Sequence, residues 1–171
     1  SKGEIGDVSL DVDAVSAICP TCHITLVDAA SGDTRDLFPA VQSLAATGVQ
    51  FISMSWSVPE SSTAPAHDSY FTHPNTLYVA ASGDNGFNDK SGKCGGQPVC
   101  YPAAAPGVIA AGGVSTTQDS KSYYFSAWKG AGSGCAKYAP EAPAQAAAIG
   151  NPCSGDKPVA DAVVWVDVPG A

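Results

Sequence analysis

The sequence has 171 residues, enough for one domain with a substantial buried core. Its 8 Lys and Arg face 16 Asp and Glu, so a net charge of −8 argues against a nucleic-acid partner. No apolar run approaches the roughly 20 residues of a membrane span, which argues against a membrane protein. Charged residues make up 14% of the chain against about 25% in an average soluble domain. Together with the acidic pI, this favours a secreted protein that works in acid.

The first part of the chain alternates helical and strand-like patterns. Apolar residues at helical spacing predict an amphipathic, partly buried helix over 7–18 and another over 34–47. Between and after them, runs rich in β-branched residues predict strands at 23–27 and 49–54. This alternation is typical of a parallel sheet with crossover helices.

The alternation continues less regularly towards the end of the chain. A weaker helix is expected over 64–73, followed by strands at 77–81 and 108–111. Aromatic alternation begins at Tyr123, and residues 130–158 are expected to form an irregular loop. The predicted fold is therefore α/β, a three-layer parallel sheet with helices on both faces, and residues 1–171 form a single domain without a linker.

The six cysteines fall into three local pairs. Pairing of nearest neighbours is the simplest of the possible connectivities: Cys19 with Cys22, Cys94 with Cys100, and Cys135 with Cys153. The alternative is a zinc site, because Cys19, Cys22 and His23 superficially look like a ligand cluster. No second closely spaced Cys or His pair completes such a site. Disulfides, and hence an oxidising compartment, are therefore favoured over a metal.

Acidic residues stand at two places where they could do chemistry. Glu4, Asp7 and Asp11 lie at helical spacing and form one stripe, although a solvated acidic helix face is the simpler interpretation. Asp28, Ser55 and Asp84 follow three predicted strands, and ligands of parallel sheets gather at the carboxyl ends of strands. The helix and this edge must meet in one cavity if the carboxylates act together.

Several segments occur in the order of the motifs of a known family. They are residues 9–20 (SLDVDAVSAICP), 24–27 (ITLV), 51–56 (FISMSW), 81–86 (ASGDNG), 101–106 (YPAAAP), 111–113 (AGG), 126–135 (SAWKGAGSGC) and 159–161 (VAD). Together they resemble the sedolisins, which are serine-carboxyl peptidases with a subtilisin-like fold. The similarity spans nearly the whole chain and looks closest to the bacterial, xanthomonalisin-like branch.

The resemblance implies roles for the carboxylates. Asp11 matches the family's orienting Asp, and Asp7 stands where the family has its Glu general base, with Glu4 as a substitute. Asp is one methylene shorter than Glu, and a displacement of ~1 Å at a catalytic group can cost ~100-fold in rate. Asp84 matches the oxyanion Asp, which donates a hydrogen bond when protonated. An Asx-turn is the simpler alternative for Asp84.

The same resemblance implies a substrate-binding surface for a protein or peptide. Its residues would be Ser55, Trp56, Gly132 and Ser133, although a tryptophan such as Trp56 is more often a core residue. The implied reaction is peptide-bond hydrolysis by acyl transfer to a serine, carried out by a secreted endopeptidase.

Two parts of the family pattern do not occur in these 171 residues. The nucleophilic serine belongs to a Gly-Thr-Ser-x-x-x-Pro segment, and the calcium site of the family also lies downstream of the matched motifs. We therefore expect the central segment of a catalytic domain, with no cofactor of its own, inactive alone and with the rest of its domain as a partner. The alternative is a non-catalytic secreted module or a proteolytic fragment that retains the peptidase scaffold.

Overall fold

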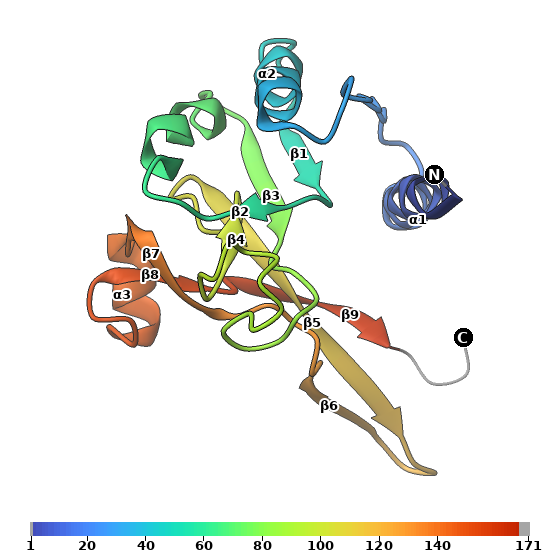
Figure 1. The fold of residues 1–171 in the computed structure, drawn as a ribbon. Helices are drawn as coiled ribbons and strands as arrows, with labels where there is room; N and C mark the ends of the chain where they lie inside the picture. Colours follow the sequence, from blue (N-terminus) through green and yellow to red (C-terminus); the bar gives the residue numbers. More distant parts are fainter. Residues whose placement is uncertain (1, 168–171) are drawn as a thin grey trace.

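The computed structural model describes residues 2–167, with side chains described except for those of residues 2–5, 7 and 162–167. A five-stranded sheet forms its centre (Figure 1). Its strands are β1 (Phe51–Met54), β3 (Leu77–Ala81), β5 (Val108–Gln118), β6 (Tyr123–Ala127) and β9 (Ala162–Asp167). All pair in parallel except β6, which runs antiparallel to β5. The sheet is therefore mixed, whereas the sequence pattern predicted a parallel one.

One face of the sheet carries the hydrophobic core. Helix α2 (Thr34–Ala45) begins at Asp33, whose carboxylate accepts a hydrogen bond from the Arg35 backbone N–H at 2.9 Å. The helix and the 3₁₀ helix η1 (Ala64–Phe71) bury Phe38 and Phe71 against the strands. The strand predicted at 77–81 is confirmed with the same bounds, and the helix predicted over 34–47 and the strands predicted at 49–54 and 108–111 are confirmed with shifted ends. The predicted helix over 64–73 takes the tighter 3₁₀ form.

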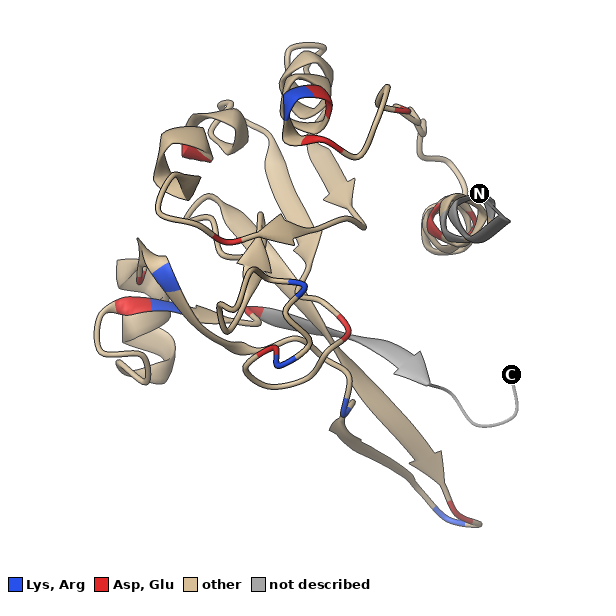
Figure 2. Ribbon diagram, in the orientation of Figure 1, with Lys and Arg blue, Asp and Glu red and all other residues tan. Residues whose placement is uncertain are grey.

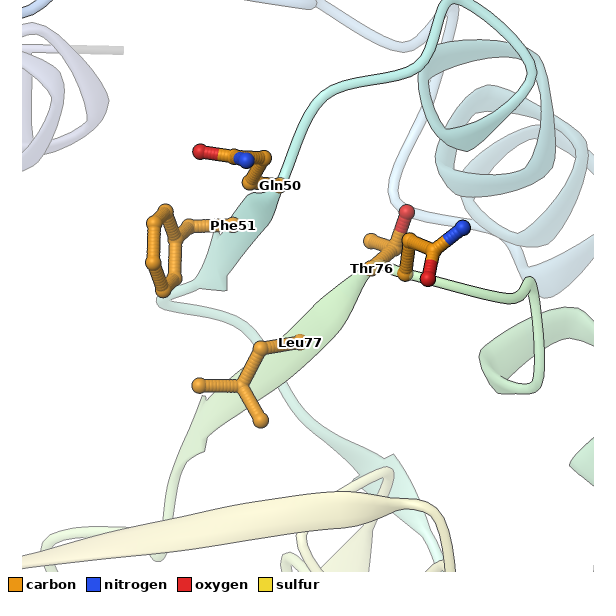
Figure 3. Close-up of a pocket in the computed structure, with 5 residues that line it drawn as sticks. Gln50, Phe51, Thr76 and Leu77 are labelled. Atoms are coloured by element: carbon orange, nitrogen blue, oxygen red, sulfur yellow. The ribbon is translucent and has the colours of Figure 1, made fainter.

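The other face of β1 and β3 is open to solvent at its amino-terminal end. Phe51 pairs with Leu77 in the parallel register, and their side chains project to the same side of the sheet (Figure 3). Phe51 is 72% exposed and Leu77 is 43% exposed. Alternation along the strands places Ile52 and Tyr78 in the core instead.

Helix α1 (Lys2–Ile18) confirms the predicted helix but not its burial. It lies apart from the sheet in Figure 1, and its apolar side chains face water, with Val8 41%, Val15 41% and Ile18 88% exposed. The expectation of an amphipathic helix with a buried stripe is therefore wrong for this structure. No helix among the described residues is both long and apolar enough to cross a bilayer.

The strand predicted at 23–27 is wrong. These residues follow α1 as irregular chain, and Ile24, Leu26 and Val27 are 41–60% exposed. A strand needs a neighbour to pair its backbone N–H and C=O groups. No strand in the described part of the chain lies beside this segment to provide those hydrogen bonds.

The irregular loop predicted over 130–158 is also wrong. This region contains β7 (Gly134–Pro140), the short helix α3 (Pro143–Ile149) and β8 (Asp156–Val159). Strands β7 and β8 form a separate antiparallel pair, and two further short strands, β2 (Val58–Pro59) and β4 (Cys100–Tyr101), form another. These elements are too short, and too rich in Gly and Pro, to show a clear period in the sequence.

All three cysteine pairs predicted from nearest neighbours are confirmed as disulfides. The bond between Cys19 and Cys22 closes the turn after α1, and the other two hold the 94–100 loop and the β7–β8 region. Because Cys19 and Cys22 are bonded to each other, their sulfurs do not form the zinc site that was considered as an alternative.

A buried lysine joins β8 to the loop before β5. Lys157 is only 2% exposed, and its Nζ donates to the carbonyl oxygens of Ala103, Ala105 and Val108 at 2.9, 2.8 and 2.6 Å. The Asp161 carboxylate lies 3.3 Å from this Nζ and accepts the Ala110 backbone N–H at 2.7 Å. Burial lowers the pKa of Lys157, and the neighbouring Asp161 opposes that shift.

A buried glutamate joins the segment after β2 to β7. Glu60 is 3% exposed, and its carboxylate accepts the backbone N–H groups of Lys137 and Tyr138 at 3.0 Å each. Burial raises the pKa of Glu60 above its ordinary value, although these two hydrogen bonds oppose the shift. The folded protein therefore binds the Glu60 proton more tightly than the unfolded chain does.

The raised pKa predicts how Glu60 affects stability as pH changes. Its contribution is complete below the ordinary value of 4.5 and is lost as pH rises through the raised value. Relative to Glu60→Gln, we expect the wild-type protein to gain stability on acidification, measured by urea unfolding at several pH values. Asp28→Asn, at an exposed carboxylate, is the matched control. A difference that stays constant or shrinks in acid would contradict this expectation.

Candidate functional site

Asp11 of α1 and Ser55 after β1 are in direct contact. The Ser55 hydroxyl donates to the Asp11 carboxylate, with 3.0 Å between Oγ and Oδ1, although the residues are 44 positions apart in the chain. Both side chains are exposed. This hydrogen bond brings together two residues that the sequence assigned to one site.

Asp84, Gly132 and Ser133 meet in a second group, where two loops pair through their backbones. The Gly132 N–H donates to the Gly83 carbonyl at 2.7 Å, and the Ser133 N–H donates to the Gly86 carbonyl at 3.4 Å. The loop after β3 thus presents Asp84, which is exposed, beside the segment that contains Gly132 and Ser133.

Glycine is needed at two positions of this paired structure. Gly83 has a φ of +105°, a conformation that residues with a Cβ rarely adopt. At Gly132, a Cβ would lie 2.0 Å from the Ser82 carbonyl oxygen, so only glycine permits this approach of the two loops. The glycines therefore fix the position of the Asp84 loop.

The two groups lie at the same edge of the sheet. Strands β1 and β3 are parallel neighbours, with Met54 level with Ala80, so Ser55 and Ala81 stand side by side at the carboxyl ends. Neighbouring strands are about 4.8 Å apart. Asp84 follows Ala81 by three residues, and Asp11 reaches Ser55 directly. The carboxyl edge predicted from the sequence therefore carries the Asp11–Ser55 contact at the end of β1 and the start of the Asp84 loop at the end of β3.

The two candidate bases lie outside the described side chains. Only the backbone of Glu4 and Asp7 is described, and it lies in α1. Asp7 precedes Asp11 by one helical turn. The prediction that one of them is a general base stays a prediction.

Trp56 is half-buried next to Ser55. Its ring lies 6.0 Å from that of Phe38, at the margin of an aromatic cluster that also contains His67, with 5.1 Å between the Phe38 and His67 rings. This packing supports the core role that was the alternative for Trp56. Its assignment to substrate binding stays a prediction.

Most acidic residues elsewhere in the described part of the chain are dispersed. They lie on α1, α2, η1, β8 and the loops rather than in one patch (Figure 2). Asp89 lies close to Cys94 and Cys100, but these sulfurs are joined in a disulfide. The Asp89 carboxylate also accepts the Cys94 backbone N–H at 2.8 Å, so it serves as a loop cap.

A hollow of about 390 Å³ lies at the opposite, amino-terminal edge of β1 and β3 (Figure 3). Gln50, Phe51, Asn75, Thr76 and Leu77 line it. The Thr76 hydroxyl is already bonded to the Val49 carbonyl at 2.8 Å. With no ionisable side chain in its lining, this hollow offers no acid or base.

The sequence reasoning missed the buried charged residues Glu60 and Lys157. The sequence did contain a signal for their burial, because each of these charged residues stands next to a proline in an apolar segment. Glu60 follows Pro59, and Lys157 precedes Pro158. The pairing of Asp11 with Ser55 left no such signal, because it depends on where α1 is placed relative to the end of β1.

Comparisons with solved structures show a shared fold. The chain is similar to Pseudomonas sedolisin, a serine-carboxyl proteinase complexed with two molecules of pseudo-iodotyrostatin, with 21% identity and a TM-score of 0.65. The match covers 78% of this chain and 43% of that one, so the chain spans less than half the length of this relative. The subtilisin-like α/β fold expected from the sequence is confirmed.

Weaker similarities concern other proteases. The prenylagaramide maturation protease is 19% identical with a TM-score of 0.42, over 67% of this chain and 36% of its own. The epidermin leader peptide processing serine protease of Staphylococcus aureus is 20% identical with a TM-score of 0.40, over 67% and 33%. No curated protein sequence matches the chain.

The sequence also matches a family model, that of the subtilase family, over residues 3–159. Since this match covers most of the 171 residues, the chain belongs to the subtilase family and has the scaffold of a serine peptidase.

Proposed function

We propose that these residues are the central part of the catalytic domain of a secreted, acid-acting serine-carboxyl endopeptidase of the sedolisin type, in its xanthomonalisin-like branch. The observation that carries the proposal is the meeting of Asp11 with Ser55 at the same strand edge from which the Asp84 loop begins. Membership of the subtilase family and the order of the sequence motifs support it.

In the proposed mechanism the chain supplies the carboxylates. Asp7, or Glu4 in its place, takes the proton from a serine hydroxyl as that oxygen attacks the peptide carbonyl carbon. Asp11 orients this base, and the base later returns the proton to the leaving amine. Asp84, in its carboxylic acid form, donates a hydrogen bond to the carbonyl oxygen as negative charge develops on it.

The serine would come from residues outside these 171, because the sedolisin nucleophile segment does not occur among them. Any calcium site of the sedolisin type would also lie there. The remaining part of the domain is therefore the proposed partner of this chain, which alone would be inactive.

The proposed substrate is an unfolded or acid-loosened polypeptide that lies along the carboxyl edge of the sheet. Trp56, Gly132 and Ser133 would form part of its binding surface. Three disulfides fit the oxidising compartment that secretion implies.

Peptide cleavage in acid tests this proposal. We expect the complete reading frame that contains these residues to cleave a fluorogenic peptide at about pH 4, and the 171-residue chain to show no turnover under the same conditions. Asp11→Asn in the complete protein should reduce kcat by roughly 100-fold or more.

The control is Asp13→Asn, at an exposed carboxylate on the same helix, which should retain activity. A complete frame that ends at Ala171, or one that cleaves nothing in acid, would favour the non-catalytic secreted module instead. Turnover by the isolated chain would contradict the assignment of the nucleophile to other residues.

A further inference from the structure

Ser55 reaches the edge of the sheet on the face opposite the core. Burial alternates along β1, with Ile52 and Met54 inward, so Phe51, Ser53 and Ser55 point to the other side. Helix α1 approaches from that side, and the Asp11 carboxylate accepts the Ser55 hydroxyl at 3.0 Å. The contact therefore depends on the strand register and on the placement of α1.

The chemistry of this contact is directional. An ionised carboxylate only accepts hydrogen bonds, and a serine hydroxyl donates a single one. Donation to Oδ1 fixes how the Asp11 carboxylate is turned and leaves Oδ2 for another donor. The residue one helical turn earlier, position 7, is the proposed site of the general base.

A hydroxyl used in this way is not available to donate to a bound peptide. Donation to a peptide carbonyl would need the Ser55 proton, whereas the structure commits that proton to Asp11. On the basis of the proposed function, we propose that Ser55 is a positioning residue for the Asp11 carboxylate rather than a hydrogen-bond donor to the substrate.

Kinetics of the complete protein distinguish the two roles. Ser55→Ala should lower kcat by about tenfold with little change in KM. The free energy of a hydrogen bond to a charged group corresponds to a rate change of about this size. Ser55→Thr keeps the hydroxyl and should restore kcat to within about twofold of the wild type. Ser53→Ala, on the same face of β1, is the matched control and should match the wild type.

A spectroscopic measurement on the 171-residue chain tests the contact without activity. The carboxyl ¹³C resonance of Asp11, at one fixed pH, should move in Ser55→Ala, stay in place in Ser53→Ala and return in Ser55→Thr. A purely structural effect of strand damage would move it in both alanine variants.

Two outcomes would overturn the proposal. One is an Asp11 resonance that does not respond to Ser55→Ala, and the other is a raised KM with kcat unchanged. A complete protein without turnover would defeat the proposed function, and with it any catalytic role of Ser55, while the resonance would still report the hydrogen bond separately.

Discussion

Lys157→Met is expected to lower the free energy of unfolding by about 3–5 kcal/mol, the usual cost of removing one partner from a buried ion pair. Methionine fills a similar volume but leaves the Asp161 carboxylate without its cation and three backbone carbonyls without their shared donor. For a chain of this length the melting temperature should fall by roughly 10 °C. Urea and thermal unfolding followed by circular dichroism measure both quantities.

Lys137→Met is the matched control, because Lys137 lies on the neighbouring strand β7 and is exposed. Its effect should stay within about 0.5 kcal/mol. If Lys157→Met does not fold, Lys157→Arg keeps the charge and should give measurable protein of intermediate stability. A loss below about 1 kcal/mol in Lys157→Met would show that the buried amine does not hold β8 to the loop before β5.

Asp84→Ala is expected to reduce kcat of the complete protein by about 100- to 1000-fold, the usual cost of losing one oxyanion donor. Stability should change little, because the Asp84 side chain is exposed and the loop is held by the backbone bonds of its glycines. Peptide cleavage at acid pH, together with an unfolding curve, separates the two effects.

Asp84→Asn adds a pH test to this prediction. Its amide donates a hydrogen bond whether or not the solution is acidic, so activity should partly return and should decline less as pH rises. Asp13→Ala is the control for loss of an exposed carboxylate. If Asp84→Ala retains full activity but loosens the loop, the simpler Asx-turn explanation of this residue would be correct.

The central elements of the fold were predictable because they carry strong local signals. Helix α2 has apolar residues at helical spacing, among them the buried Val41, and β3 is a compact apolar run. Residues 23–27 have an equally strong strand pattern, yet they stay irregular because a strand is defined by its neighbour. Local pattern alone could not reveal this.

The site was predictable in its parts but not in its connections. The family resemblance assigned roles to Asp84, Gly132 and Ser133, and the structure adds that backbone hydrogen bonds join the loops that carry them. The contact of Asp11 with Ser55 depends on the position of α1. The apolar residues of this helix are exposed, so their spacing in the sequence does not predict that position. The elements within 134–159 were missed because their order comes from a disulfide and from strand pairing rather than from periodicity.

The open apolar face around Phe51 and Leu77 also affects the thermodynamics of the chain. The heat capacity change of unfolding grows with the apolar surface that becomes newly hydrated. Side chains already in water in the native state, such as Phe51 and Ile18, add little to it. The stability of this chain should therefore vary less steeply with temperature than that of a domain of equal length whose apolar groups are all enclosed.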